Sequence, residues 1–314
     1  KNFRKPKIWG SKLSLGMDDD FGFFHTIEAY IELLDTVKKK DFLNYVELKV
    51  GNPKYYTIGN VDLNHHEVSM FYSFKKISSY IKDDYRIVCE IGGGFGSLAS
   101  KLKKKYSNLC IIIIDLPEAI ILQSYYLLKL YPEKKFCFYN DFIKLSPDEL
   151  KSNNYDFIII PPWTKQKIIN LFKIDYFINT HSFQEMDKEI VNDYFKFINK
   201  TIRVNGIFYC LNKYTKTINN KPIKISEYPF DSYWELLSSQ KGWRNENMHE
   251  IILKRQNYEN PLTKRIIQNL PKENFSIRKT STKLFVKLFI RKILDCFIFF
   301  IPKKILLKLL KMYI

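Results

Sequence analysis

The sequence lacks the patterns of several protein classes. Its five cysteines are widely spaced, and they form neither a C-x-x-C pair nor a His/Cys metal spacing. A disulfide framework and a metal site are therefore not expected. Cys89, Cys110 and Cys210 lie inside expected strands and fit small buried side chains in a reducing compartment, so we predict a cytoplasmic protein.

Signals for targeting and long apolar runs are also missing. Lys1 stands where a Met is usual, which suggests an excised fragment, and no signal-peptide pattern follows it. In the C-terminal tail, residues 283–314, the longest uncharged stretch is Cys296–Pro302 with seven residues. A membrane-spanning helix needs about 20 apolar residues. The tail is therefore too often interrupted by charge to cross a bilayer.

The positive charge is concentrated near the C-terminus. From Gln256 onward the chain has thirteen Lys and Arg against three Asp and Glu, and the tail alternates lysines with apolar runs. This pattern favours an amphipathic helix in peripheral contact with an anionic membrane on its inner face. The alternative is a pair of helices packed on the domain or across a homo-oligomer. The remaining lysines are spread out, and a nucleic-acid partner is not required by them.

A glycine-rich turn is the most informative feature of the chain. The apolar strand Arg86–Ile91 carries Glu90 and runs directly into Gly92, Gly93, Gly94 and Gly96. Glycines let the backbone approach a cofactor closely, and the helix that follows offers free N–H groups. A second buried strand, Ile111–Ile114, ends in Asp115, which is placed to accept the hydroxyls of a ribose. The pair predicts a nucleoside cofactor at the top of a parallel sheet.

The identity of that cofactor follows from charge and spacing. The glycines fit G-x-G-x-G rather than the dinucleotide pattern G-x-G-x-x-G. Glu90 would repel a pyrophosphate but suits a cationic amino-acid end. We therefore favour S-adenosylmethionine over a nicotinamide dinucleotide.

Hydrophobic content of 46% in 314 residues supports a full core. Strands and helices alternate from residue 86 onward, which predicts an open, mostly parallel α/β sheet with helices on both faces. Helices are expected before it at 26–47 and 64–82. We divide the chain into an N-terminal helical cap (1–82), a Rossmann-like domain (83–255), and a basic linker with an amphipathic tail (256–314).

Several segments together resemble the S-adenosylmethionine-dependent sugar O-methyltransferases. The resemblance covers about 80–255, and its most specific string is Asn179-Thr-His-Ser-Phe-Gln-Glu-Met186; Ile114–Glu118, Asp156–Trp163 and Glu227–Asp231 also contribute. It implies a Rossmann-like class I methyltransferase that acts on a sugar hydroxyl during glycan or polysaccharide assembly. It also makes 156–160 and 175–179 the third and fourth core strands and Phe136–Tyr139 an edge strand.

We assign residues to a cofactor side and an acceptor side of the site. Glu90, the glycine turn and Asp115 would hold the cofactor, together with four further residues: Leu116, Pro161, Pro162 and Asn179. Residues on the acceptor side would be His66, Trp163, Tyr228 and Asp231. The alternatives to these acceptor-side roles are surface or packing roles for His66, and core packing for the aromatic segment that contains Tyr228.

His181 is the candidate general base, because it follows the fourth strand at the carboxyl edge of the sheet. A sugar hydroxyl is a poor nucleophile, and a neutral imidazole can take its proton. Glu185 would orient His181 if one helix carried both residues. The competing interpretation is that Ser182 and Glu185 form a capping box.

Two other functions stay open at this stage. Pro161-Pro162-Trp163 is similar to the loop of nucleic-acid amino-methyltransferases, although Ile160 offers no acceptor for the target amine. A non-catalytic cofactor-binding protein would keep the glycines and not need His181.

Overall fold

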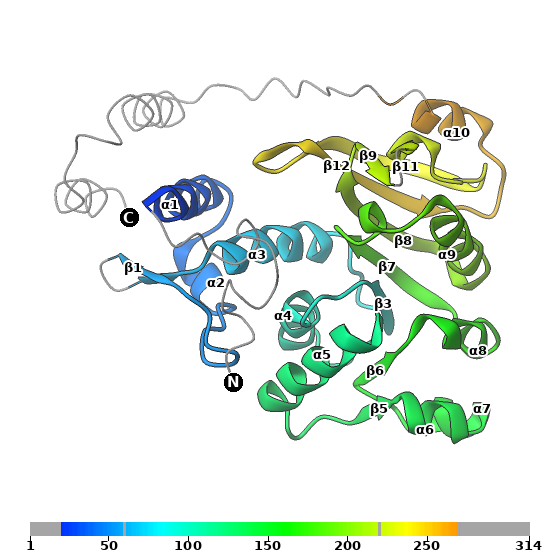
Figure 1. Cartoon of the computed structure of the whole chain (residues 1–314). Coiled ribbons are helices and arrows are strands. Elements are labelled where there is room, and N and C mark those ends of the chain that lie inside the picture. The colour runs from blue at the N-terminus through cyan, green and yellow to red at the C-terminus, as the bar shows by residue number, and fades with distance from the viewer. Residues whose placement is uncertain (1–19, 59–60, 219–220, 269, 271–314) are drawn as a thin grey trace.

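A computed structural model describes residues 20–58, 61–218, 221–268 and 270. Its centre is an eight-stranded sheet in the spatial order β5–β6–β4–β3–β7–β8–β12–β11 (Figure 1). The strands are β3 (Ile87–Ile91), β4 (Cys110–Ile114), β5 (Phe136–Phe138), β6 (Phe157–Ile160), β7 (Ile174–Thr180), β8 (Ile202–Lys213), β11 (Trp234–Gly242) and β12 (Asn245–Arg255).

The direction of the strands identifies the fold. Six neighbouring strands, from β5 to β8, pair in parallel, while β12 is antiparallel to both β8 and β11. This order, with one reversed strand beside the last of the parallel ones, is the Rossmann-like class I methyltransferase fold. The assignment of 156–160 and 175–179 as the third and fourth core strands is confirmed by β6 and β7, and β5 is the added edge strand.

Helices cover both faces of this sheet. One face carries α1 (Asp20–Leu34), α2 (Lys39–Leu43), α3 (His65–Ser78), α4 (Ser97–Lys105) and α5 (Pro117–Leu130). The other face carries α6 (Tyr139–Lys144), α7 (Pro147–Ser152), α8 (Lys165–Leu171), α9 (Lys188–Thr201) and α10 (Pro261–Gln268). Figure 1 shows the two groups on opposite sides of the strands.

The sheet separates two cores because strand side chains alternate. In β4, Ile111 and Ile113 belong to the cluster under α1, α3, α4 and α5, while Ile112 and Ile114 belong to the cluster under α8 and α9. All four are fully buried. A near-continuous apolar strand of this kind is typical of a parallel sheet covered on both faces.

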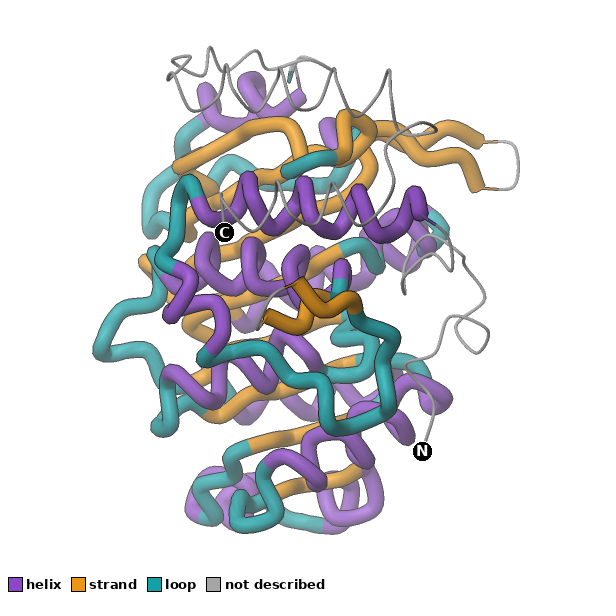
Figure 2. The backbone as a smooth tube through the Cα atoms, turned by 90° about the vertical axis from the view of Figure 1, so that its left-hand side faces the viewer, coloured by secondary structure: helices purple, strands orange, loops and turns teal. Residues whose placement is uncertain are grey.

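Two small hairpins lie outside the main sheet. β1 (Tyr56–Ile58) pairs with β2 (Val61–Leu63), and β9 (Thr215–Ile218) pairs with β10 (Lys221–Lys224). The second hairpin follows β8 directly and stands away from the sheet (Figure 2). Short 3₁₀ turns complete the described elements: η1 (Pro162–Thr164), η2 (Phe183–Glu185) and η3 (Ile225–Glu227).

The single helix expected over 26–47 is wrong. It is split into α1 and α2 by a turn at 35–38, where the hydroxyl of Thr36 donates to the carbonyl of Leu33. A threonine that bonds the backbone in this way competes with the helical pattern. The tail at 283–314 lies outside the described residues. No helix among the described residues has the length and apolar content to cross a bilayer.

Candidate active site

The strand register brings four loops together at one edge. Ile91 pairs with Ile114, Ile114 with Ile160, and Thr180 with Leu211, so the loops after β3, β4, β6 and β7 leave the sheet at the same end. This is the carboxyl edge, where open α/β sheets bind their ligands. The predicted cofactor and acceptor residues that follow these strands are therefore neighbours in space.

Glu90 is buried beneath the glycine turn. Its side chain is 1% exposed, and its Oε2 has no hydrogen-bond partner. A Cβ built on Gly93 would lie 3.3 Å from this oxygen, so the carboxyl group and the turn are in close contact. Burial, assisted by the negative charge of Asp115, raises the pKa of Glu90 to about 8. A cation placed next to this carboxyl group would therefore favour its ionised form.

The turn itself uses backbone conformations that suit glycine. Gly92 and Gly94 have φ of +74° and +59°, the left-handed region in which a side chain is strained. A Cβ on Gly92 would lie 2.2 Å from the Cβ of Ser182, whereas one on Gly94 would meet no atom within 4 Å. Gly92 therefore packs tightly against the loop after β7, and Gly94 borders open space.

Asp115 lies at the tip of β4 and faces the same turn. Its Oδ2 accepts from the N–H of Gly94 at 3.1 Å and from Nε2 of Gln123 at 2.6 Å, and its Oδ1 accepts from the N–H of Leu116 at 2.8 Å. Burial raises the pKa of Asp115 to about 6 in spite of these bonds. A carboxylate can accept about four hydrogen bonds. Asp115 is thus held rigidly and retains acceptor capacity for a further donor.

Two large apolar residues that follow neighbouring strands, β4 and β6, are exposed. Leu116 follows β4 and Trp163 follows β6, and each is 61% exposed. The ring of Trp163 also meets Tyr139 edge-on, at 6.1 Å between centroids. Pro161 and Pro162 begin the turn η1, in which the carbonyl of Pro161 accepts from the hydroxyl of Thr164. Such exposed apolar surface beside Asp115 is available to a flat ligand ring.

His181 has an unusual backbone for its residue type. Its φ is +66°, and its N–H donates to the carbonyl of Leu211 at 2.8 Å. The left-handed conformation costs a non-glycine residue about 1–2 kcal/mol. Burial lowers the pKa of His181 below its usual range, so its imidazole is neutral at physiological pH. A strained, neutral histidine at the carboxyl edge fits a proton acceptor.

Asn179 is the centre of a buried hydrogen-bond network under this turn. Its Nδ2 donates to the carbonyl of Ile91 at 3.0 Å and to Oγ of Ser182 at 2.6 Å. Its Oδ1 accepts from Nδ2 of Asn212 at 2.8 Å and from the N–H of Phe183 at 3.3 Å. All of these partners belong to the protein. Asn179 was predicted to bind the cofactor, but the structure gives it the role of joining the glycine turn to the His181 turn.

Both sequence-based interpretations of Glu185 are wrong in geometry. No continuous helix carries His181 and Glu185, because η2 ends at Glu185 and α9 begins only at Lys188. The capping box is also not formed, since Oγ of Ser182 donates to the carbonyl of Ile91 instead. Glu185 is exposed on this turn.

The N-terminal helices bring two histidines to the site with different surroundings. The ring of His66 lies 4.9 Å from that of Phe95 in the glycine turn, and its place on the acceptor side stays a prediction. His65 instead stacks on His25 of α1 at 4.7 Å. The tip of the β11–β12 hairpin reaches the same helix, where Arg244 binds Glu28 and Glu32 at 2.6 and 2.9 Å. Helix α1 and the hairpin thus contact each other through Arg244, which lies beyond the carboxyl end of β8.

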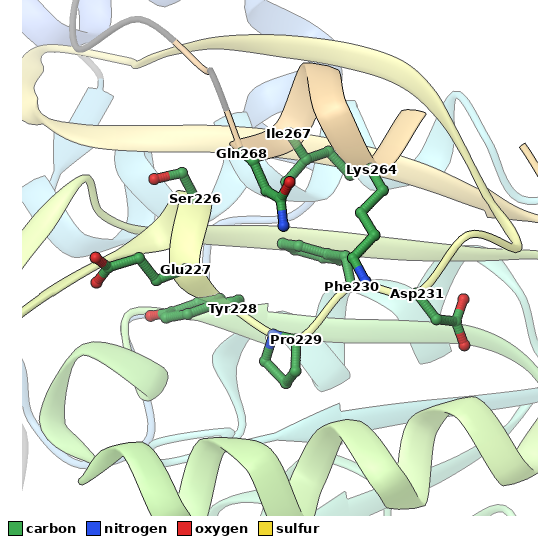
Figure 3. A pocket seen from close by; sticks show the side chains of 9 residues that line it. All are labelled: Ser226, Glu227, Tyr228, Pro229, Phe230, Asp231, Lys264, Ile267 and Gln268. Atoms are coloured by element: carbon green, nitrogen blue, oxygen red, sulfur yellow. The ribbon is translucent and has the colours of Figure 1, made fainter. Parts of the chain in front are cut away.

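The predicted acceptor residues Tyr228 and Asp231 do not fit that role. Tyr228 is 5% exposed and packs against Phe183 and Phe195. Asp231 binds Arg255, which pairs with Trp234 at the amino edge of the sheet, opposite the glycine turn. These residues line a separate pocket of about 320 Å³ with Lys264, Ile267 and Gln268 of α10; Figure 3 shows Asp231 pointing away from Gln268. The sequence did not reveal this position, because the chain crosses from the carboxyl edge to the amino edge of the sheet between β10 and β11.

Three residues that support the site were missed. Gln123 of α5 holds Asp115, Asn212 of β8 holds the His181 turn, and Lys216 of β9 donates to the carbonyls of Phe183 and Met186. None lies in a local motif, and only long-range pairing brings them here. In the part of the chain that the structure describes, no three His, Cys, Asp or Glu side chains are grouped to hold a metal ion.

No family model matches the chain, and a search of curated proteins gives no match. Solved structures do resemble it. The mitomycin 7-O-methyltransferase MmcR shares 12% identity over 60% of this chain, which spans 55% of that protein, with a TM-score of 0.41. An rRNA methylase from Streptococcus thermophilus shares 13% over 60% of this chain and 97% of its own (TM-score 0.41). The glycopeptide N-methyltransferase MtfA, solved with S-adenosylmethionine, shares 6% over 58% and 92% (TM-score 0.37).

Proposed function

We propose that the protein is an S-adenosylmethionine-dependent O-methyltransferase that acts on a sugar hydroxyl of a glycan or glycan precursor. One observation carries the proposal: Glu90, fully buried beneath the glycine turn, has a carboxyl oxygen without a hydrogen bond. Leaving a buried polar atom unsatisfied costs about 1–3 kcal/mol. A ligand ammonium at this position would remove that cost and bind strongly.

The residues around Glu90 suit the other parts of such a cofactor. Gly94 offers open space beside its backbone, Asp115 keeps capacity to accept from a ribose hydroxyl, and Leu116 and Trp163 offer apolar surface to a purine. Pro161 and Pro162 precede Trp163 at the same edge. The cofactor would supply a methyl group on a sulfonium centre. The protein must hold it in line with the acceptor and remove a proton.

His181 is proposed to take that proton. Burial keeps its imidazole neutral, and its turn lies next to the glycine turn through the contact between Ser182 and Gly92. Glu185 is exposed and is not needed for this role. His66, against Phe95, is proposed to contact the acceptor. The choice of a sugar rests on the resemblance of 179–186 to sugar O-methyltransferases.

A nucleic-acid amino-methyltransferase gains no support. Such an enzyme needs an acceptor side chain before the Pro-Pro-aromatic sequence, and Ile160 at that position is aliphatic and fully buried. Loss of methyl transfer with rising salt and transfer to RNA or DNA would favour this alternative.

The proposal is tested in two steps. Calorimetry with S-adenosylhomocysteine, and with NAD as a control, tests the cofactor. We expect heat with the first and none with the second; the reverse would reject the proposal. Transfer of labelled methyl groups to nucleotide-linked, lipid-linked and polymeric glycans, with RNA as a control, then tests the acceptor class.

The basic and apolar sequence at 283–314 supports a further part of the proposal, a peripheral contact with an anionic membrane. This contact would bring the enzyme to a lipid-linked acceptor. Flotation with anionic liposomes, comparing the whole chain with one that ends at residue 282, tests it. Equal partition of both proteins would reject the membrane contact.

A further inference from the structure

Lys216 is a buried lysine with an unusual set of partners. It lies in β9, the first strand of the hairpin that follows β8, and is 4% exposed. Its Nζ donates to the carbonyls of Phe183 and Met186. These carbonyls stand at the first residue of η2 and just after its end. The ammonium therefore closes the turn that follows His181.

This contact stabilises the turn from a side that the sheet does not reach. The sheet holds the turn through the carboxamides of Asn179 and Asn212, which accept from the N–H groups of Phe183 and Gln184. Those bonds fix N–H groups only. Lys216 fixes carbonyl groups, and it comes from a hairpin that stands away from the sheet (Figure 2). The turn is thus held by donors and acceptors from two independent elements.

His181 is the residue that needs this support. Its φ of +66° is strained, and a strained backbone persists only when its surroundings over-determine it. Burial lowers the pKa of Lys216, so placing an ammonium there also has a cost, which the two carbonyls offset. Packing alone does not explain why a buried ammonium binds two backbone carbonyls next to a strained histidine.

We propose that Lys216 is a positioning residue for His181: by binding the carbonyls of Phe183, at the start of η2, and Met186, just after it, Lys216 holds His181 in its left-handed conformation at the carboxyl edge. The inference rests on the proposed function in one respect, the role of His181 as proton acceptor. It assigns a purpose to the β9–β10 hairpin, which is otherwise an addition to the fold.

The test compares Lys216→Met with Lys213→Met in the whole chain. Methionine keeps an unbranched apolar stem but cannot donate to the carbonyls. Lys213 is a matched control because it is exposed, lies three residues earlier and removes the same charge. Amide hydrogen exchange over 181–186 is the first measurement. We expect Lys216→Met to accelerate it about tenfold or more, and Lys213→Met to leave it unchanged.

The second measurement is the NMR titration of the His181 imidazole, assigned with His181→Gln. In Lys216→Met the pKa of His181 should rise toward its ordinary value of about 6.5 as the turn opens to water. Binding of S-adenosylhomocysteine should stay within about twofold of wild type, since the hydrogen bonds of Lys216 go to Phe183 and Met186 and not to the glycine turn. Should Lys216→Met fail to fold, Lys216→Leu, which also has no donor, replaces it.

The inference is overturned if Lys216→Met, or its replacement, exchanges 181–186 at the wild-type rate, or if Lys213→Met has the same effect. Neither result depends on the acceptor. A wild-type protein that does not bind S-adenosylhomocysteine would instead reject the proposed function, so the two failures are distinguishable.

Discussion

The carboxyl edge has two halves, one around β3 and β4 and the other around β7 and β8, and they differ in how their polar groups are bonded. Around β3 and β4, Glu90 is buried with an unsatisfied oxygen, and Gly94 borders open space. Around β7 and β8, the carboxamides of Asn179 and Asn212 bond to one another and to the backbone, and a left-handed His181 sits on top of them. The first half leaves a buried oxygen of Glu90 unsatisfied, whereas the second half satisfies the carboxamides of Asn179 and Asn212 within the protein.

The difference suggests that one half binds the cofactor and the other positions the proton acceptor. An unsatisfied buried carboxyl group is stabilised when a ligand supplies a partner, so the first half contributes binding free energy for the cofactor. A satisfied network gains nothing from a ligand but fixes geometry, so the second half positions the proton acceptor. Gly92, packed on Ser182, joins the two.

The strongest way to break this comparison is His181→Ala. If the second half serves only catalysis, methyl transfer to the best glycan acceptor should fall about 10²–10⁴-fold. Affinity for S-adenosylhomocysteine should stay within about twofold, because His181 lies outside the half that binds it. Single-turnover assays and calorimetry measure the two quantities. Wild-type turnover would remove His181 as the base.

The second variant, Glu90→Gln, tests the first half. Removing the charge that the ligand ammonium would meet should lower affinity for S-adenosylhomocysteine about 30-fold or more. The same change should raise the melting temperature of the ligand-free protein at pH 8, by roughly 2–4 °C per kcal/mol of relieved burial cost. Glu185→Gln is the matched control and should alter neither. A variant that binds with wild-type affinity would contradict the role of Glu90.

The pH dependence of the ligand-free protein sharpens the same point. Glu90 has a pKa of about 8 when folded and 4.5 as its ordinary value, so the folded state holds more protons between these values. Stability contributed by this group therefore falls as pH rises from 4.5 to 8. Denaturant titrations at several pH values should show this fall in wild type and a smaller one in Glu90→Gln. Identical pH profiles of the two proteins would count against the buried carboxyl group.

Ligand affinity should change with pH in the opposite direction. The ammonium of S-adenosylhomocysteine requires ionised Glu90, so affinity should rise between pH 6 and 8, by at most about tenfold per unit. Calorimetry in buffers of different ionisation enthalpy counts the protons released. An affinity independent of pH over this range would show that Glu90 is not the partner.

The smallest effect is expected from Glu185→Gln. Glu185 is exposed. No continuous helix joins it to His181, and it forms no capping box with Ser182. Turnover should therefore stay within about twofold of wild type. A loss of tenfold or more in kcat would restore Glu185 as a partner of the base and would weaken the division between the two halves.

The sequence predicted the first half well, because its residues are local. A strand with Glu90, a glycine turn and the strand ending in Asp115 follow one another closely, and each has a recognisable composition. In the second half the sequence pointed to Asn179 and His181 but not to the residues that support them. Its supporting residues, Asn212 and Lys216, lie on strands that pairing alone brings to the turn. The local geometry around Glu185 was misjudged because the pattern S-x-x-E cannot tell whether Ser182 bonds forward to a helix or back to Ile91.

From its sequence alone the chain determines a parallel α/β sheet with a glycine turn and an acid at the next strand. Apolar periodicity and glycine conformation act over a few residues, and they suffice for this. The tertiary structure decides which polar atoms are satisfied and which are not: Glu90 without a partner, Asn179 with four, and Asp231 at the opposite edge from the site. Hydrogen-bond satisfaction depends on strand register and burial, and these are properties of the whole sheet.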